Sequence, residues 1–316
     1  MKTQVLTDAR VAAEIVRAGG IVAFPTETVF GLGADATNPA AIEKLFWAKG
    51  RPTDNPLIVH VANRQKIFEI AICVSDSAAL LLSAYSPGPI TVVLPKNSVI
   101  IDKVTAGFNS VGVRVPDHPR ALEFLRYADL PIAAPSANRS GKPSGTSVEA
   151  VLEDLDGRID AILSGELSRV GVESTVVDCT QNPPYLLRPG AISLEQLQAV
   201  VPKIALAKDE LTQGNSPGLK YAHYQPSARV RLFDSFSELP AEVNDACLCM
   251  EAPPAHLRQR LGFLKQFDSV EQYARDFYES LRQADRQGIV SVYCQRVPEV
   301  GIGRALADRM GRAAGK

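Results

Sequence analysis

The spacing of apolar residues along the chain predicts an alternation of helices and strands. Apolar side chains three and four positions apart predict helices over residues 8–18, 39–49, 118–127, 147–155 and 194–200. Short runs rich in β-branched residues predict strands at residues 21–24, 57–62, 90–94, 111–115, 131–134, 160–164 and 174–179. Several connections are too short for a parallel crossover, so we expect a mixed sheet. This pattern predicts one α/β domain over residues 1–205.

The pattern is interrupted once and then resumes. Residues 206–228 carry Gly, Pro and Ser at irregular positions and show no period, which favours an interdomain linker. Beyond them, apolar runs predict strands at 230–234, 246–250 and 289–294, and helices at 270–287 and from about residue 303. We therefore expect a second, smaller α/β domain over residues 229–316.

Composition narrows the class of protein. Of the 316 residues, 34 are basic and 35 are acidic, and the formal net charge of −1 disfavours a protein that coats nucleic acid. The five cysteines include no C-x-x-C pair and the four histidines are far apart, which predicts structural thiols in a reducing compartment and no metal site. The N-terminus is charged where a signal peptide is apolar, and no apolar run reaches the ~18 residues of a membrane span. We expect a cytoplasmic protein without membrane contact.

The first candidate for ligand binding is the helix-to-strand connection AKGRPTDNPLIVH, residues 48–60. Lys49 and Arg51 lie at the end of the expected helix, where cations often only offset the helix dipole. Here Asn55 and His60 add two hydrogen-bonding side chains, and two prolines stiffen the backbone. Rigidly held cations suit a polyphosphate, so this connection is a candidate phosphate site.

Two glycine-containing segments are further candidates for a phosphate site. The loop PIAAPSANRSGKPSGTS, residues 131–147, runs from a predicted strand to a predicted helix, which favours anion binding over an ordinary surface loop. The segment GLGADA, residues 31–36, imitates a dinucleotide fingerprint but does not directly follow the strand at residues 21–24. We interpret its glycines as the backbone freedom of a tight turn. A dinucleotide-dependent oxidoreductase is accordingly disfavoured.

Further polar residues stand at the ends of predicted strands. Thr26 and Thr28 follow the strand at residues 21–24, while Ser174 and Arg188 lie in GVESTVVDC and LLRPG. Arg114 lies inside an otherwise apolar strand, where it either faces solvent or pairs with a carboxylate. No Ser-His-acid signature, cysteine nucleophile or general base is evident. The set suits positioning and charge stabilisation, as in nucleotidyl transfer.

Seven motifs occur in an order that resembles the YrdC-like threonylcarbamoyl-AMP synthases. They are PTETVFGLG (25–33), KGRPTDNPLIVH (49–60), SPGPITVVL (86–94), VGVRVPDHP (111–119), PIAAPSANRSG (131–141), VESTVVD (172–178) and LRPG (187–190). SPGLKYAHYQP (216–226) is similar to the interdomain signature of the two-domain members. The resemblance implies an open, twisted, mixed YrdC-like sheet with helices, followed by a small Rossmann-like α/β domain.

The resemblance also implies a reaction. An L-threonylcarbamoyladenylate synthase makes threonylcarbamoyl-AMP and pyrophosphate from L-threonine, bicarbonate or CO2, and ATP with Mg²⁺. The product would feed the threonylcarbamoyladenosine modification of tRNA position 37 through separate tRNA threonylcarbamoyltransferase proteins. Contact of the synthase with tRNA is compatible with this role but is not required by it.

Residue roles follow from the same resemblance. The expected catalytic cations are Lys49 and Arg51. The expected ATP-binding residues are Lys49, Arg51, Asn55, Ser110, Ser136, Asn138, Ser144, Arg188 and Tyr224, and the expected threonine-binding residues are Thr26, Thr28, His60, Arg114, Ala134 and Ser174. The linker residues Lys220, Tyr221, His223 and Tyr224 are expected to cover the pocket and keep water from a labile adenylate.

Two other functions stay open on the sequence. A YrdC-like module could bind double-stranded RNA or tRNA without adenylate chemistry, although the near-neutral charge disfavours it. A related carbamoyl-transfer enzyme would use carbamoyl phosphate, but such relatives carry zinc-binding cysteine motifs and an acylphosphatase-like segment that this sequence lacks. Neither alternative predicts threonine-dependent use of ATP.

Overall fold

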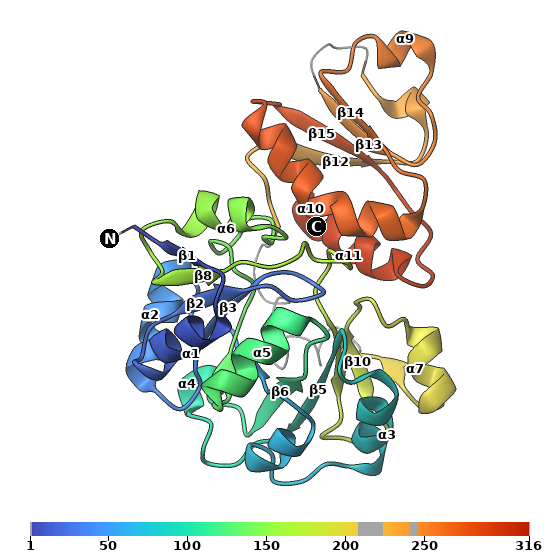
Figure 1. The fold of residues 1–316 in the computed structure, drawn as a ribbon. Helices are drawn as coiled ribbons and strands as arrows, with labels where there is room; N and C mark the ends of the chain where they lie inside the picture. Colours follow the sequence, from blue (N-terminus) through green and yellow to red (C-terminus); the bar gives the residue numbers. More distant parts are fainter. Residues whose placement is uncertain (1, 208–223, 241–244, 316) are drawn as a thin grey trace.

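A computed structural model describes residues 2–207, 224–240 and 245–315 (Figure 1). Within these residues, one sheet has eleven strands and a second has four. The larger sheet contains, in spatial order, β1 (Gln4–Leu6), β8 (Ala161–Leu163), β2 (Val22–Phe24), β3 (Gly31–Asp35), β7 (Ile132–Ala133), β4 (Ile58–His60), β6 (Ser110–Arg114), β5 (Ile90–Pro95), β9 (Thr175–Asp178), β10 (Tyr185–Arg188) and β11 (Ala205–Leu206). The linker residues Lys220, Tyr221 and His223 lie outside the described residues, so their role as a cover stays a prediction.

The larger sheet is mixed, as the short connections predicted. β4 pairs with β6 and β5 pairs with β9 in parallel, whereas β4–β7, β5–β6 and β9–β10 are antiparallel pairs. The tight connection between β2 and β3 likewise gives an antiparallel pair. This mixed α/β architecture confirms the predicted fold class.

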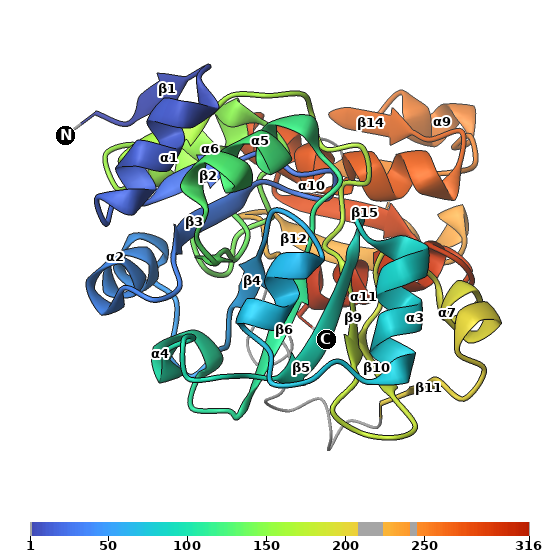
Figure 2. The ribbon, with the colours of Figure 1, turned by 60° about the horizontal axis from the view of Figure 1, so that its bottom comes forward.

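Alternating side chains of the larger sheet are buried under helices on both faces. Val22 and Phe24 pack with α1 (Ala9–Arg17) and α5 (Pro119–Ala128), whereas Ala23 between them faces the opposite core. Figure 2 shows α1 and α5 side by side over this end of the sheet. The other helices of this region are α2 (Pro39–Lys49), α3 (Asp76–Tyr85), α4 (Asp102–Thr105), α6 (Val148–Leu155), α7 (Leu194–Val200) and the 3₁₀ turn η1 (Gln65–Glu69).

The interpretation of the glycines in GLGADA as a tight turn is wrong. Gly31 and Gly33 lie in strand β3, antiparallel to β2. A Cβ atom on Gly31 would stand 3.1 Å from a ring carbon of Phe24, and one on Gly33 would stand 2.9 Å from Ile132. These glycines are therefore needed because neighbouring side chains cross the strand closely, which the sequence alone did not reveal.

The second sheet is parallel throughout. Its order is β12 (Arg229–Phe233), β15 (Ser291–Gln295), β13 (Ala246–Cys249) and β14 (Phe263–Gln266). The accompanying helices are α9 (Ala255–Arg258), α10 (Val270–Arg286), α11 (Gly303–Ala313) and the 3₁₀ turn η2 (Phe236–Glu238). In Figure 1, α10 and α11 lie between this sheet and the N-terminal part of the chain. These two helices therefore lie on the side of the second sheet that faces the N-terminal part of the chain.

Among the described residues, no helix has both the length and the apolar character that crossing a bilayer demands.

Candidate active site

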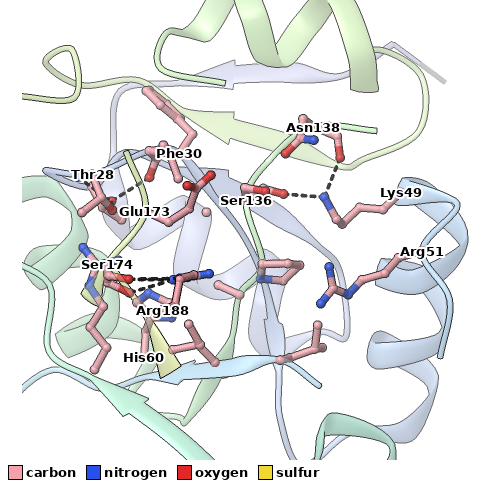
Figure 3. Close-up of a pocket in the computed structure, with 18 of the residues that line it drawn as sticks. Thr28, Phe30, Lys49, Arg51, His60, Ser136, Asn138, Glu173, Ser174 and Arg188 are labelled. Atoms are coloured by element: carbon pink, nitrogen blue, oxygen red, sulfur yellow. Dashed lines mark hydrogen bonds between the residues drawn. The ribbon is translucent and has the colours of Figure 1, made fainter. Parts of the chain in front are cut away.

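A pocket lies over β4, β6 and β7, on the sheet face that α1 and α5 cover in part (Figure 3). Strand alternation explains this placement. Val59 and Val113 are buried in the core of the opposite face, so their neighbours His60 and Arg114 point to the pocket side. The two pocket residues are also register partners in the parallel pair β4–β6. The sheet therefore brings together two polar side chains from separate motifs.

Most of the residues singled out in the sequence line this pocket. They are Thr26, Thr28, Lys49, Arg51, His60, Arg114, Ala134, Ser136, Asn138, Ser174, Arg188 and Tyr224. Their placement in one cavity is a structural fact, whereas the ligand that each one binds stays a prediction.

Three residues assigned to ATP do not line the pocket. Asn55 is buried in the same connection as Arg51, and its side-chain amide has no hydrogen-bond partner among the described residues. Ser110 lies at the opposite end of β6 from Arg114. Ser144 is fully buried, and its hydroxyl donates to the pocket residue Glu173 at 2.6 Å. The sequence motifs placed these residues near the pocket but could not give the direction of their side chains.

Lys49 is presented to the pocket by the end of α2. Asn38 caps the start of this helix, and Gly50 ends it with a φ of 60°, as its stop signals predicted. The Lys49 ammonium donates to the backbone oxygens of Ser136 at 2.6 Å and Asn138 at 2.5 Å. Burial, and then the charge of Arg51, lower the pKa of Lys49 well below its usual value. An anionic ligand would relieve this unfavourable arrangement of two cations.

Arg51 is held by the proline-containing turn that follows it. Its Nη2 donates to the backbone oxygen of Pro56 at 3.0 Å, and its Nε to that of Asn55 at 3.4 Å. The turn therefore fixes the guanidinium beside Lys49. In Figure 3, Lys49 and Arg51 lie on one side of the pocket, and Thr28, Ser174 and Arg188 lie on the other.

On the opposite side of the pocket, Arg188, Ser174 and Thr91 form a hydrogen-bonded group at the start of β9. Arg188 donates from Nε to the backbone oxygen of Ser174 at 3.1 Å and from Nη2 to its hydroxyl at 3.1 Å. The same hydroxyl is 2.8 Å from that of Thr91. Burial lowers the pKa of Arg188. Arg188, assigned to ATP from the sequence, thus contacts Ser174, which was assigned to threonine.

Arg114, which also lines the pocket, forms a buried ion pair. Its Nη2 is 2.8 Å from Oε1 of Glu27, and the two side chains are 5% and 2% exposed. Its Nε has no hydrogen-bond partner among the described residues. Of the two possibilities for Arg114, exposure to solvent or pairing with a carboxylate, the second is therefore correct. Its Nε remains as a donor for a ligand.

Glu173 is a pocket residue to which the sequence analysis gave no role. It accepts hydrogen bonds from Ser144, from Tyr278 of α10 at 3.0 Å and from Arg309 of α11 at 2.8 Å. Burial alone would raise its pKa, but Arg309 and Arg188 outweigh it and lower the pKa to about 2. The sequence signal for Glu173 was an acidic residue directly before an apolar strand. That signal could not identify Tyr278 and Arg309, because both partners lie in the second domain.

Tyr224 lines the pocket next to Tyr278 of α10. It is buried, has a positive φ of 65°, and its ring centroid is 5.1 Å from that of Tyr278. The Arg309 guanidinium carbon lies 5.6 Å from the centre of the Tyr224 ring. Burial raises the pKa of Tyr224 to about 12. Tyr224 of the linker therefore lines the pocket, and Tyr278 and Arg309 of the second domain pack against it.

Stability is expected to depend on pH through His60. Burial, and then the charge of Arg114, lower the pKa of His60 from 6.5 to about 3. Between these values the unfolded chain binds a proton that native His60 does not, so the native state loses stability as the pH falls. The free energy of unfolding should fall by up to about 1.4 kcal/mol more per pH unit in the wild type than in His60→Gln. Urea unfolding at neutral pH and near pH 5 measures this, and parallel pH profiles would contradict it.

Comparison with known proteins places this chain in a family. A family model described as telomere recombination, which groups Sua5, YciO and YrdC, matches residues 14–190. A second model, the C-terminal domain of threonylcarbamoyl-AMP synthase, matches residues 192–315. The chain belongs to the threonylcarbamoyl-AMP synthase family.

Individual family members are similar over almost the whole chain. The threonylcarbamoyl-AMP synthase of Pyrococcus abyssi is 40% identical, covering 97% of this chain and 94% of that protein. The threonylcarbamoyl-AMP synthase of Bacillus subtilis is 39% identical, covering 96% and 92%. A crystal structure of Pyrococcus abyssi Sua5 complexed with L-threonine has a TM-score of 0.90 and 37% identity, covering 100% of this chain and 98% of that one. The chain is thus an enzyme of the nucleotidyltransferase class, and the resemblance drawn from its motifs is confirmed.

Proposed function

We propose that this family member makes threonylcarbamoyl-AMP and pyrophosphate from L-threonine, bicarbonate or CO2, and ATP. The observation that carries the proposal is the arrangement of two fixed cations, Lys49 and Arg51, across one pocket from Thr28, Ser174 and Arg188, with Arg114 lining the same pocket. A relative with 37% identity over the full chain has been solved with L-threonine. The pocket therefore offers one side for a polyphosphate and another for an amino acid.

The proposed chemistry needs charge stabilisation on the cationic side. A carbamate oxygen of the threonine adduct attacks the α-phosphorus of ATP, and the bond to the departing pyrophosphate breaks. Two of the three Lys49 ammonium hydrogens are used by backbone oxygens, so one donor remains for a phosphate. Arg51 adds a second positive charge beside it. Both cations are held before the ligand arrives, which avoids reorganisation as charge develops on the leaving group.

On the other side, Arg114 is proposed to bind the threonine carboxylate. Glu27 holds this guanidinium in place, and Thr28 and Ser174 supply nearby hydroxyl groups. Because burial lowers the pKa of His60 to about 3, the imidazole is neutral near pH 7 and adds no charge to repel an amine. Selectivity for the amino acid then depends on fixed polar groups rather than on net charge.

The variant Arg114→Ala is therefore expected to raise the KM for L-threonine by about 10-fold or more, because a charge-assisted hydrogen bond contributes about 1.5–3 kcal/mol. The KM for ATP should change by less than about twofold. Steady-state rates with each substrate varied in turn measure both values. An unchanged KM for threonine would remove Arg114 from the proposed carboxylate site.

Mg²⁺ is proposed to enter as the complex with ATP. Among the described residues, no group of three or more His, Cys, Asp or Glu side chains is arranged to hold a metal ion. Glu173, an acid that lines the pocket, is already engaged by Arg309 and Tyr278. This donor set fits a cation held mainly by substrate phosphates, which is a common mode for Mg²⁺.

The product is proposed to feed the modification of tRNA position 37 through a separate transferase. The family assignment supports this role, since its members carry the synthase name. All five cysteines are free thiols, which fits the reducing cytoplasm proposed as its location.

The test is pyrophosphate release from ATP and Mg²⁺, with L-threonine and bicarbonate added singly and together. Mass spectrometry of the same reactions detects the adenylate. Release that needs both additions, with the mass of threonylcarbamoyl-AMP, is the expected result. Release without threonine would contradict the proposal. No release from folded protein would also contradict it and would favour the RNA-binding alternative, which titration at varied salt would then detect.

A further inference from the structure

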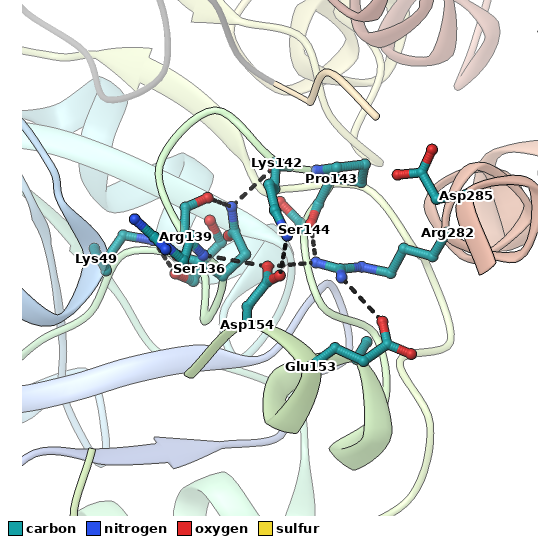
Figure 4. Close-up of polar contacts among 12 residues, drawn as sticks. Lys49, Ser136, Arg139, Lys142, Pro143, Ser144, Glu153, Asp154, Arg282 and Asp285 are labelled. Atoms are coloured by element: carbon teal, nitrogen blue, oxygen red, sulfur yellow. Dashed lines mark hydrogen bonds and ion pairs between the residues drawn. The ribbon is translucent and has the colours of Figure 1, made fainter. Parts of the chain in front are cut away.

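A buried arginine of the second domain contacts the loop that supports Lys49. Arg282 lies on α10, and its side chain is 5% exposed (Figure 4). Its Nη2 is 2.8 Å from Oδ2 of Asp154, whose side chain is fully buried at the end of α6. The same nitrogen donates to the backbone oxygen of Pro143, and Nη1 lies 3.3 Å from Glu153. One guanidinium thus joins α10 to both α6 and the loop that precedes it.

Asp154 in turn holds the pocket loop, defined here as residues 136–145. Its Oδ2 accepts from the backbone nitrogen of Arg139 at 3.2 Å, and its Oδ1 is 3.2 Å from the ammonium of Lys142. Asn138 closes the loop internally by donating to the backbone oxygens of Arg139 at 2.8 Å and Lys142 at 2.9 Å. The Asp154 carboxylate therefore holds the pocket loop in its position.

The pocket loop and Lys49 are joined by three hydrogen bonds. The ammonium donates to the backbone oxygens of Ser136 and Asn138, and the backbone nitrogen of Ser140 donates to the backbone oxygen of Lys49 at 2.8 Å. A shift of the loop would therefore move the acceptors that fix the ammonium. The contacts run without a gap from Arg282 through Asp154 to Lys49.

We infer that Arg282 is a positioning residue for the nucleotide side of the pocket, an inference that rests on the proposed function. A buried ion pair is a weak source of stability, because removing two charges from water offsets most of their attraction. The planar guanidinium is instead suited to holding a carboxylate and a carbonyl in fixed directions at the same time. This assigns a role in catalysis to the second domain through a residue that touches no substrate.

A second set of contacts ties α10 to the same loop. The carboxylate of Asp285 accepts from the backbone nitrogens of Ser227 at 2.9 Å and Ala228 at 3.0 Å. Two residues earlier, the backbone nitrogen of Gln225 donates to the oxygen of Gly141 in the pocket loop at 2.7 Å. The chain entering the second domain is therefore fixed to α10 at one point and to the pocket loop at another.

The test measures binding of MgATP and of L-threonine to the full-length chain by calorimetry. Arg282→Met should weaken MgATP binding by about 10-fold and change threonine binding by less than about twofold. Arg286→Met is the matched control, since Arg286 also lies on α10 and pairs with Glu153 but is 46% exposed and does not contact the pocket loop. This control should bind both ligands as the wild type does.

A double variant separates positioning from stability. Arg282→Met combined with Asp154→Leu replaces the pair by apolar side chains and should recover most of the thermal stability that Arg282→Met alone loses. It should not recover MgATP affinity, because the Arg139 backbone nitrogen has lost its acceptor. Recovery of both, or wild-type MgATP affinity in Arg282→Met, would overturn the inference while leaving the proposed function intact. A wild-type chain that binds no MgATP would overturn the proposed function together with the inference.

Discussion

Replacing Lys49 by alanine is expected to slow formation of the adenylate by about 100- to 1,000-fold, the usual effect of removing one preorganised charge stabiliser. Lys49 is 2% exposed, its ammonium is held by two backbone oxygens, and its pKa is lowered by burial and by Arg51. Such an ammonium is desolvated before the substrate arrives, so its attraction to phosphate is stronger than it would be in water. Arg51→Ala should have a loss of similar size.

The measurement is the rate of pyrophosphate release at saturating threonine, with folding checked by urea unfolding. Lys44→Ala is the matched control, because Lys44 lies on the same helix and also donates to a backbone oxygen, that of Gly19 at 3.1 Å, outside the pocket. It should retain the wild-type rate. A folded Lys49→Ala protein with the same rate as Lys44→Ala would show that Lys49 is not part of the catalytic site.

Replacing Glu173 by alanine is expected to lower the free energy of unfolding by about 3–5 kcal/mol, the cost of breaking a buried ion pair by removing one partner. The Arg309 side chain is fully buried and its Nε lies 2.8 Å from Glu173, so the variant leaves a charge without this carboxylate. Tyr278 loses its acceptor as well. Because these partners lie on α10 and α11, the loss should loosen the contact between the two domains.

The stabilising contribution of Glu173 should also appear in how the free energy of unfolding of the wild type depends on pH. The pKa of Glu173 is about 2 in the native state against 4.5 ordinarily, so its stabilisation is present above pH 4.5 and is lost as the pH falls toward 2. Glu195→Ala is the control, since Glu195 pairs with Arg304 of α11 at 3.5 Å but is 54% exposed. An exposed pair contributes about 0–1 kcal/mol. Equal losses in the two variants would contradict the role given to Glu173.

The two domains therefore meet at the pocket through two buried groups of contacts. One joins Glu173 to Tyr278 and Arg309 at the pocket wall. The other joins Asp154 to Arg282 behind the pocket loop. Variants of Glu173 should chiefly affect stability, whereas variants of Arg282 should chiefly affect nucleotide binding, so the two sets of experiments report on different contacts.

Local sequence determined where most helices and strands lie, whereas the family resemblance of the motifs indicated which of them meet at the pocket. Helix α2 is bounded by Asn38 and Gly50, and both signals act within a few residues, so the position of Lys49 at a helix end was predictable. The alternation around His60 and Arg114 likewise assigns them to one face of the sheet once the valines beside them are buried. Short-range backbone preferences and hydrophobic period were sufficient for these features.

Tertiary structure alone decided the partners and directions of the buried polar groups. Glu173 and Arg309 are 136 residues apart in the chain, and Asp154 and Arg282 are 128 apart. Gly31 lies in a strand although its local pattern favoured a turn, and it must be glycine because the Phe24 ring crosses the strand closely. Ion pairs and close crossings depend on which surfaces meet after folding, and residues far apart in sequence carry no local pattern that identifies one another.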